Sequence, residues 1–303
     1  MRHLLSPTDL SEKDFFRILD RAREHRNNRA LAKDALAGKS IALLFEKSST
    51  RTRLSFSVAV TEMGGTPISL DAMQLQLGRG ESLEDTTEVL ARYCHAMMVR
   101  ARDHRNLEVM AGMNRIPIIN GLSDLHHPCQ IIADYMTLEQ LGFSLHGGLR
   151  IAFVGEPNNV FNSLAVAASY AKARITIASP RAYSQIHPAI QQELTRLKTE
   201  FQQFTEPAGA VRDTQVVYTD TWVSMGQEAE EETRRKDFAD YCVTTELLSL
   251  AASGHVVLHC LPAHRGEEIT AEVMEKYKHS IFEQAENRLH AQKAILEWIF
   301  GIL

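Results

Sequence analysis

The stretch IALLFEKSSTRTR, residues 41–53, decides the fold of this 303-residue chain. Its first five residues, Ile41 to Phe45, form a short apolar run, which predicts a buried strand. A helical pattern follows from Thr52 to Met63 and ends at the glycine pair 64–65. A second strand at 66–70 comes directly after it, and this order of strand, helix and strand is typical of a parallel sheet with helical crossovers.

The same alternation continues on both sides of this stretch. Before the segment 142–148, which has three glycines in seven residues, we expect strands at 41–45, 66–70, 96–100 and 116–120 and helices at 11–26, 52–63, 82–93 and 131–141. After it we expect strands at 150–155, 174–178, 216–218 and 256–258 and helices at 162–172, 184–200 and 283–303. The sequence therefore predicts an α/β fold with two open parallel-sheet domains of similar size, helices on both faces and interdomain helices between them. The expected domains are 1–141 and 148–284, with the C-terminal helix 285–303 packing back on the first.

The composition excludes several classes of protein. A hydrophobic fraction of 44% is too high for a disordered chain, and the length corresponds to roughly two domains of about 150 residues. With 33 Lys+Arg against 38 Asp+Glu, the net charge of −5 gives no general attraction for nucleic acid or an anionic membrane. An anionic ligand therefore requires basic residues that are gathered locally.

Targeting signals and cysteine usage indicate a reducing compartment. The first residues, MRHLLSPTDLSEKDFF, lack the apolar run of a signal peptide, and no stretch of about 18 apolar residues predicts a membrane span. The cysteines form no C-x-x-C pair and the histidines no H-E-x-x-H pattern. We therefore expect a cytoplasmic protein without a metal; its four cysteines are Cys94, Cys129, Cys242 and Cys260.

Polar residues follow the strands of the first predicted domain, where open parallel sheets bind ligands. Segment 46–53 places hydroxyls and cations at a helix N-terminus, which favours an anion site; the alternative is an ordinary N-cap with solvated charges. The segment lacks the G-x-x-x-x-G-K-[ST] pattern of a P-loop. Arg100 ends a further strand, and His127-Pro128-Cys129-Gln130 opens a helix. His127 and Gln130 can both donate to a carbonyl or phosphate oxygen, although a proline at the first helical position with a polar cap is the alternative.

The second predicted domain has polar strand ends of another kind. Asn159, Asp220 and Ser224 have the chemistry to bind an amino acid, with the Asp220 carboxylate paired to an ammonium group. No G-x-G-x-x-G pattern is present at Gly155, so we discount a nicotinamide cofactor. Cys260 follows His259, but neighbours on a strand point to opposite faces, which disfavours a Cys–His dyad and leaves a buried apolar thiol as the alternative.

Taken together, these motifs resemble the aspartate/ornithine carbamoyltransferase family from about Leu5 to the C-terminus. The segment Phe45-x-Lys47-x-Ser49-Thr50-Arg51-Thr52-Arg53 is similar to the carbamoyl-phosphate signature of the family, and residues 127–130 to its second element. The ornithine-type signatures are matched by Asp220-x-Trp222-x-Ser224-Met225-Gly226, His259-Cys260-Leu261-Pro262 and Glu283-Gln284-Ala285-Glu286-Asn287-Arg288. One segment departs from the family pattern Gly-Asp-x-Asn-Asn, because this chain has Gly155-Glu156-Pro157-Asn158-Asn159.

The resemblance implies transfer of the carbamoyl group of carbamoyl phosphate to the side-chain amine of L-ornithine, which gives L-citrulline and phosphate. No cofactor is implied, and the implied assembly is a homotrimer or a multiple of trimers with shared active sites. The implied carbamoyl-phosphate residues are Ser49, Thr50, Arg51, Thr52, Arg100, His127, Pro128, Cys129, Gln130, Cys260, Leu261, Arg288 and, reaching into a neighbouring subunit's site, Gln76. The implied ornithine residues are Asn159, Asp220, Ser224 and Met225, and the implied catalytic residues are Cys260, Asp220, Arg100 and His127.

Two other functions remain open at this point. A sister transferase that uses putrescine shares the amine chemistry, whereas aspartate needs cations that the segment around Asp220 does not offer. A catalytically silent binding subunit on the same fold is the alternative from a different class. The sequence distinguishes neither arginine synthesis from arginine breakdown nor a trimer from a dodecamer.

Overall fold

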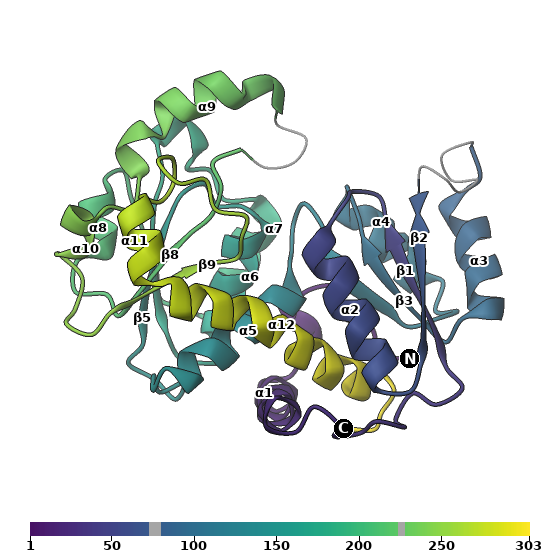
Figure 1. The fold of residues 1–303 in the computed structure, drawn as a ribbon. Helices are drawn as coiled ribbons and strands as arrows, with labels where there is room; N and C mark the ends of the chain where they lie inside the picture. Colours follow the sequence, from purple (N-terminus) through teal and green to yellow (C-terminus); the bar gives the residue numbers. More distant parts are fainter. Residues whose placement is uncertain (73–79, 224–227) are drawn as a thin grey trace. The chain divides into compact units, whose positions relative to one another are not determined.

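The computed structural model describes residues 1–72, 80–223 and 228–303. By internal contacts the chain divides into two compact units, which are described separately (Figure 1). Unit 1 consists of Met1–Met136 and Asn287–Leu303, and unit 2 consists of Thr137–Glu286. No helix among the described residues is long and apolar enough to cross a membrane.

Unit 1 is built on a four-stranded parallel sheet with the strand order β2-β1-β3-β4. Its strands are β1 (Ser40–Phe45), β2 (Thr66–Asp71), β3 (Ala96–Arg100) and β4 (Ile118–Leu122). Its helices are α1 (Glu12–Asn27), α2 (Thr50–Glu62), α3 (Leu83–Tyr93), α4 (His104–Gly112) and most of α5 (Pro128–Gln140), together with the C-terminal part of α12 (Lys278–Ile299). The central strands β1 and β3 are buried almost throughout, as expected for strands with helices on both faces.

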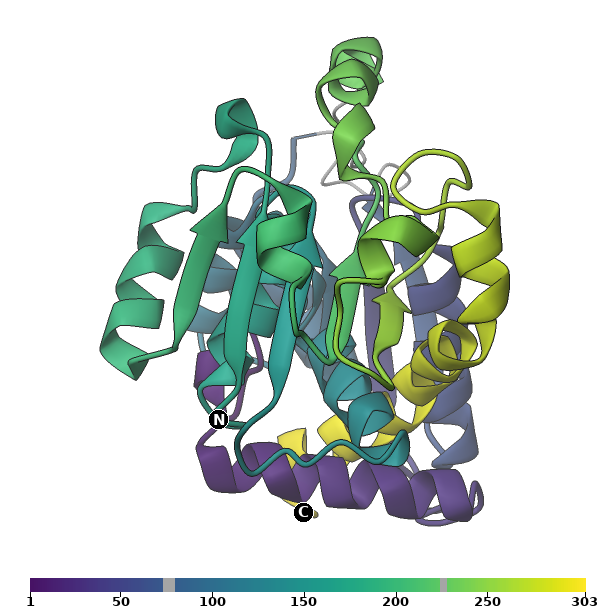
Figure 2. The same ribbon diagram turned by 90° about the vertical axis from the view of Figure 1, so that its left-hand side faces the viewer.

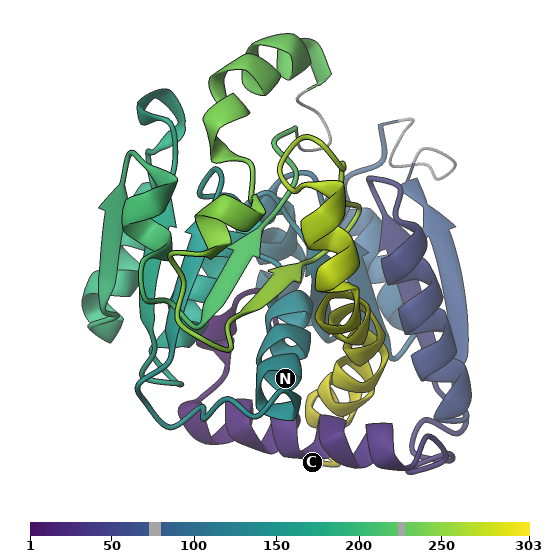
Figure 3. The same cartoon turned by 60° about the vertical axis from the view of Figure 1, so that its left-hand side comes forward.

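The C-terminal part of α12 carries buried charges into unit 1, where it lies beside α1 (Figure 3). The fully buried Glu297 carboxylate accepts from Arg21 Nε at 2.5 Å and from Arg21 Nη2 at 2.8 Å, and it lies 3.1 Å from His25 Nε2. Burial alone raises the pKa of Glu297, but Arg21 and His25 lower it to about 2. Lys293 is also fully buried and forms an ion pair with Glu62 at 2.5 Å. This end of α12 is therefore held by charge pairs as well as by apolar packing.

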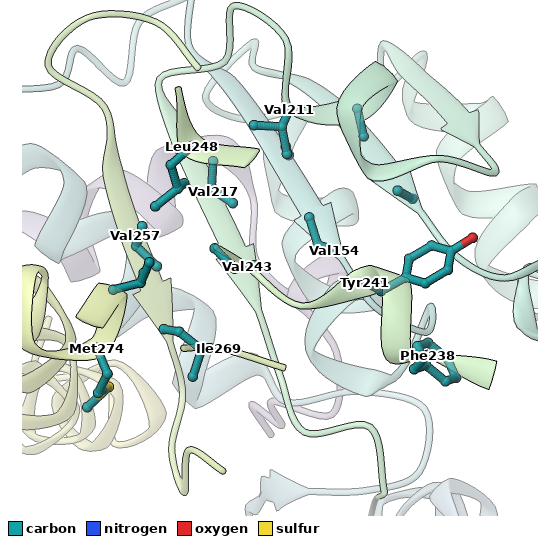
Figure 4. Packing of buried hydrophobic residues seen from close by; sticks show 14 of the residues in the cluster. Val154, Val211, Val217, Phe238, Tyr241, Val243, Leu248, Val257, Ile269 and Met274 are labelled. Carbon is teal, nitrogen blue, oxygen red and sulfur yellow. The ribbon is translucent and has the colours of Figure 1, made fainter. Parts of the chain in front are cut away.

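Unit 2 contains a five-stranded parallel sheet with the order β7-β6-β5-β8-β9 (Figure 2). Its strands are β5 (Arg150–Val154), β6 (Arg174–Ala178), β7 (Phe201–Phe204), β8 (Val216–Thr219) and β9 (Val256–His259). Its helices are α6 (Asn159–Ala168), α7 (Pro188–Leu197), α8 (Pro207–Val211), α9 (Glu231–Asp237), α10 (Thr245–Leu248) and α11 (Ala271–Lys276), with the start of α12. One face of the sheet packs on a cluster of buried side chains from β5, β8, β9 and the loops beyond them, including Val154, Val217, Val257, Phe238 and Tyr241 (Figure 4).

The expected fold class is confirmed, and all eight expected strands are present. Several boundaries differ because caps and prolines set them: α2 begins at Thr50 since Ser49 is its cap, and α7 begins at Pro188 rather than 184. The helix α7 also ends before 200, at Leu197, because its C-cap Lys198 adopts a left-handed conformation with φ of 54°. The edge strand β7 was not expected, because the sequence FQQF lacks an apolar run. The helices α4 and α8 to α11, at most nine residues each, were also missed.

Candidate active site

Each sheet has a topological switch point, where the connections that follow two neighbouring strands run in opposite directions. Open α/β sheets bind ligands at the carboxyl ends of the strands at such a point. In unit 1 this point lies between β1 and β3, and in unit 2 between β5 and β8. Segment 46–53 follows β1 and Arg100 ends β3, whereas Asn158 follows β5 and Asp220 follows β8. The topology therefore brings the predicted polar residues to one point in each unit.

The start of α2 in unit 1 has the geometry of an anion site. Ser49 is the N-cap, and its Oγ accepts from the backbone N–H of Thr52 at 3.3 Å. Thr50 and Arg51 in the first turn are exposed, while Thr52 is fully buried. The remaining N–H groups of the first turn and the helix dipole favour a negative charge at this end.

Arg288 brings a buried cation to this helix start. Its side chain is only 4% exposed, and its Nη2 donates to Thr52 Oγ1 at 2.7 Å across 236 positions of sequence. Because the Thr52 hydroxyl accepts from a cation, its own hydrogen remains available for an oxygen of a ligand. The sequence placed Arg288 at the start of a helix, but it lies within α12.

His127 is a buried neutral imidazole beside two arginines. Its pKa lies well below the usual value, first because burial disfavours the charged ring and second because Arg288 and Arg100 add positive charge. Arg100 is itself buried at the end of β3. A neutral ring among cations offers a ligand a hydrogen bond without adding another charge.

The first turn of α5 contributes the rest of the predicted motif. Pro128 is the first residue of the helix, as the alternative interpretation of this segment required. Gln130 is fully buried; its Nε2 donates to Asp134 Oδ1 at 2.8 Å, while its Oε1 has no hydrogen-bond partner among the described residues. The Cys129 thiol faces the carbonyl of Asn120 at 3.4 Å, and burial raises its pKa to about 12, so it is not a nucleophile at neutral pH.

Glu46 has contacts near the predicted anion site that the sequence did not single out. It follows β1, and its carboxylate accepts from the Arg102 N–H at 2.7 Å and from Asn106 Nδ2 at 3.3 Å. Arg102 Nε in turn donates to the Glu46 carbonyl at 3.2 Å. These contacts join the loops beyond β1 and β3 and engage Arg102, which lies two residues after the end of β3.

In unit 2 the Asp220 carboxylate is the centre of a hydrogen-bond network. Cys260 Sγ donates to Asp220 Oδ1 at 3.1 Å, and Asn158 Nδ2 donates to Asp220 Oδ2 at 2.8 Å. The backbone N–H of Thr221 also donates to Oδ1, at 2.9 Å. The same Asn158 side chain caps α6 through its Oδ1, and Asn159 is the first residue of this helix. The structure thus brings Asp220 and Cys260 together, with Asn159 next to Asn158 at the start of α6.

His259 pairs with Glu268 and with the backbone beyond it. Its Nε2 lies 3.0 Å from Glu268 Oε1, and its Nδ1 accepts from the Leu261 N–H at 2.9 Å. Leu261 has a left-handed φ of 61°, which is unusual for leucine, and this hydrogen bond helps to hold it. The expectation that Cys260 and His259 form no dyad stays a prediction: the thiol donates to Asp220, while a ring nitrogen of His259 lies within 4.8 Å of the sulfur. Gln284 Oε1 accepts from the His259 N–H at 2.9 Å, a contact that the sequence did not reveal.

Two groups of side chains among the described residues have donor atoms close enough to hold a metal ion. They are Asp220 with His259 and Cys260, and His264 with Glu267 and Glu268. In the first group both ring nitrogens of His259 already have partners, and in the second Glu267 is paired with Arg235 at 2.9 Å. The expectation of a protein without a metal stays a prediction.

Three predicted site residues lie outside the described residues: Gln76, Ser224 and Met225. The predicted roles of all the other site residues stay predictions as well, since geometry alone shows only where they lie.

The fold and the two strand-end sites define a two-unit α/β protein with one cation-rich site and one carboxylate-centred site. Two family models match the chain: the carbamoyl-P binding domain of aspartate/ornithine carbamoyltransferase over residues 2–140, and the Asp/Orn binding domain over residues 147–299. Since these matches cover most of its length, the chain belongs to the aspartate/ornithine carbamoyltransferase family.

Individual relatives match over nearly their whole length. The ornithine carbamoyltransferase of Archaeoglobus fulgidus is 47% identical over 99% of this chain and 98% of its own. The crystal structure of the anabolic ornithine carbamoyltransferase of Campylobacter jejuni superposes with a TM-score of 0.93 at 36% identity and covers 100% of both chains. The Pyrococcus furiosus ornithine carbamoyltransferase has a TM-score of 0.92 at 41% identity and covers 100% of this chain and 98% of its own.

Proposed function

We propose that this protein transfers the carbamoyl group of carbamoyl phosphate to the side-chain amine of L-ornithine, which yields L-citrulline and phosphate. The observation that carries the proposal is the pair of strand-end sites: a buried Arg288–Thr52 contact at a helix start in unit 1, and the Asp220–Cys260 contact in unit 2. The full-length similarity to proteins named ornithine carbamoyltransferase supports the same substrates.

Unit 1 supplies the carbamoyl-phosphate residues in this proposal. Ser49, Thr50, Arg51 and Thr52 hold the phosphate at the start of α2, and Arg100 and Arg288 neutralise its charge. His127 donates to the carbonyl oxygen of the carbamoyl group, and the unpartnered Gln130 Oε1 accepts from its NH₂. Pro128 and Cys129 set the first turn of α5, and Gln76 is the residue contributed by a neighbouring subunit.

Unit 2 supplies the ornithine residues. Asp220 pairs with an ammonium group of the amino acid, and Asn159, Ser224 and Met225 complete the contacts. Cys260 and Leu261 follow β9, and the family resemblance supports roles for both toward carbamoyl phosphate and the reacting amine. We propose that residues 1–141 with helix 285–303 form the domain that binds carbamoyl phosphate, and that residues 148–284 form the domain that binds ornithine.

The proposed mechanism relies on positioning and electrostatics. The neutral side-chain amine attacks the carbonyl carbon, and the oxyanion of the tetrahedral intermediate is stabilised by Arg100, His127 and the Thr52 hydroxyl. The bond from this carbon to the phosphate oxygen then breaks, and phosphate leaves on the cations of unit 1. The amine loses one proton in the process, for which Asp220 and Cys260 are the nearby groups.

The assembly, location and pathway are proposed more broadly. We place the enzyme in arginine biosynthesis, since the relative from C. jejuni is named anabolic. Family resemblance supports a homotrimer or a multiple of trimers. A cytoplasmic location fits four cysteines that form no disulfide, all of which lie among the described residues.

A substrate panel tests the function. The purified protein is given carbamoyl phosphate with ornithine, putrescine, N-acetylornithine, lysine or aspartate, and the carbamoylated product and phosphate are measured. Citrulline formation with the highest kcat/KM for ornithine is the expected result. Turnover with putrescine or aspartate but not with ornithine contradicts the proposal, and binding of carbamoyl phosphate without turnover of any amine indicates a silent binding subunit.

A further inference from the structure

Arg234 of α9 is a buried arginine that contacts two loops of unit 2. Its side chain is 5% exposed, and its Nη1 and Nη2 donate to the two carboxylate oxygens of Glu156 at 2.6 and 3.3 Å. Nη1 also donates to the backbone carbonyl of Trp222 at 3.1 Å, and Nε donates to Glu230 at 3.0 Å. All three guanidinium nitrogens are therefore used, in the forked geometry that lysine does not offer.

The surroundings of Arg234 make the loss of its ion pair with Glu156 energetically unfavourable. The guanidinium carbon lies 4.8 Å from the centre of the Tyr183 ring, and Phe238, four residues further on, is fully buried in the core (Figure 4). Burial by itself lowers the pKa of Arg234, but Glu156 and Glu230 raise it above the usual value. A buried cation that loses its carboxylate partner is strongly unfavourable, so the position of Glu156 is tied to that of Arg234.

Glu156 is joined to the ornithine site by a tight turn. The backbone N–H of Asn158 donates to the Glu156 carbonyl at 2.7 Å, which closes a three-residue turn around Pro157. The fixed φ of proline suits this turn, and the missing N–H of Pro157 costs nothing there. A shift of Glu156 is therefore passed to Asn158, whose Nδ2 holds the Asp220 carboxylate.

Two connections thus join the loops beyond β5 and β8. The first is the Asn158–Asp220 hydrogen bond, and the second runs from Glu156 through Arg234 to the Trp222 carbonyl, two residues after Asp220. The hydrogen bonds of Arg234 go to Glu156, Glu230 and Trp222, and none of them reaches Asp220 or Asn158. Arg234 therefore acts on Asp220 through the two loops. Glutamate in place of the family aspartate at 156 adds one methylene to the reach of this carboxylate.

We propose that Arg234 and Glu156 are positioning residues that set the place of Asp220, and with it the affinity for the amino-acid substrate. This inference rests on the proposed function, because it takes Asp220 as the group that binds ornithine. Loss of the contacts that join Glu156, Arg234 and Trp222 should change only the ornithine contacts and leave the cation-rich site of unit 1 intact.

Four single variants, one double variant and a matched control test the proposal. Arg234→Gln removes the charge and one fork of hydrogen bonds, and we expect the KM for ornithine to rise about tenfold or more while the KM for carbamoyl phosphate stays within about twofold. Glu156→Gln should have a smaller effect in the same direction, and Arg234→Lys and Glu156→Asp should restore part of the affinity. The Glu156→Gln/Arg234→Gln double variant should be no worse than Arg234→Gln, because both changes remove the same connection. The control is Arg235→Gln, since Arg235 is the next residue and is half exposed in pairs with Glu231 and Glu267.

Several results would overturn the proposal. Equal effects of Arg234→Gln and Arg235→Gln, a parallel rise in both KM values, or additive effects of the two single changes would each contradict it. Circular dichroism and thermal unfolding check the fold; if Arg234→Gln does not fold, the Glu156 variants decide, because that side chain is 26% exposed. Wild-type protein that forms no citrulline overturns the proposed function and this inference together, whereas an active wild type with unchanged Arg234 and Glu156 variants overturns the positioning role alone.

Discussion

The two units place their polar residues at the same topological position but with opposite charge. In unit 1 the point between β1 and β3 is occupied by a capped helix start, the buried Arg100 and the Thr52–Arg288 contact. In unit 2 the point between β5 and β8 is occupied by the Asp220 carboxylate, which accepts from Asn158, Thr221 and Cys260. The sheet therefore determines where a ligand binds, and the side chains after each strand determine which charge it carries.

The largest effect is expected from the carboxylate of unit 2. Asp220→Asn keeps the shape but removes the charge that we propose pairs with the ammonium group of ornithine. The loss of a buried charge pair costs about 3–5 kcal/mol, so kcat/KM for ornithine should fall by roughly three orders of magnitude. Steady-state kinetics with varied ornithine measure this, and a fall of less than tenfold would remove Asp220 from the ornithine site.

Unit 1 depends on the C-terminal part of α12 for one of its cations, and Glu297 helps to hold that part. Because the pKa of Glu297 is lowered to about 2, its contribution is present above about pH 4.5 and is lost as the pH falls toward 2. At neutral pH, Glu297→Gln should lower the free energy of unfolding by about 3 kcal/mol, since Arg21 and His25 lose their partner. Urea unfolding at neutral and at acidic pH measures this; an equal difference between variant and wild type at both pH values would contradict it.

Arg51 tests the anion site at the start of α2. Arg51→Ala should remove the proposed charge-assisted contact with the phosphate, a loss of roughly 1.5–3 kcal/mol in transition-state binding. The control is Arg53→Ala, because Arg53 lies over the Phe45 ring and donates to Ser69 of β2 instead. If kcat/KM for carbamoyl phosphate falls less than tenfold for Arg51→Ala, or equally for both variants, the phosphate assignment is wrong.

The Thr52 hydroxyl should have a smaller effect of the same kind. Thr52→Val keeps the shape but removes the hydroxyl that accepts from Arg288 and that we propose donates to the ligand. We expect kcat/KM for carbamoyl phosphate to fall roughly tenfold, the value of one hydrogen bond to a charged group. Thr61→Val on the exposed side of the same helix is the control, and the same loss in both variants would contradict the role of the hydroxyl.

The protonation state of the His127 ring should hardly change with pH near neutrality, which distinguishes this residue from a charged residue of the site. Since burial, Arg288 and Arg100 lower its pKa well below 6.5, the ring should stay neutral between about pH 8 and pH 6. NMR of the imidazole ring measures this, with the His127→Asn variant to assign the signal. A ring that becomes protonated in this range would contradict the electrostatic description of unit 1.

Much of the fold and of the site could be predicted from local sequence. Apolar runs such as Ile41–Phe45 give the strands, and the polar residues directly after them give Ser49, Arg100 and Asp220 as candidates. Short helices such as α9 were missed, because a run of seven residues shows no clear period. The partners that hold the site residues in place could not be predicted, since they lie far along the chain.

Arg234 and Arg288 show why such partners are hidden. Arg234 bonds Glu156 across 78 positions and Arg288 bonds Thr52 across 236, and neither pair has a local pattern. Glu156 was noticed as a departure from the family segment, and its partner explains the longer side chain. The predicted contacts of Gln76, Ser224 and Met225 lie outside the described residues and stay predictions.

The assignment of one substrate to each unit is tested most directly by the dissociation constant of carbamoyl phosphate for the Asp220→Asn variant, measured by titration calorimetry against wild type. If unit 1 binds carbamoyl phosphate and unit 2 binds ornithine, this constant should stay within about twofold of wild type while kcat/KM for ornithine falls. A loss of carbamoyl-phosphate affinity as large as the loss for ornithine would contradict the assignment of the two substrates to the two units.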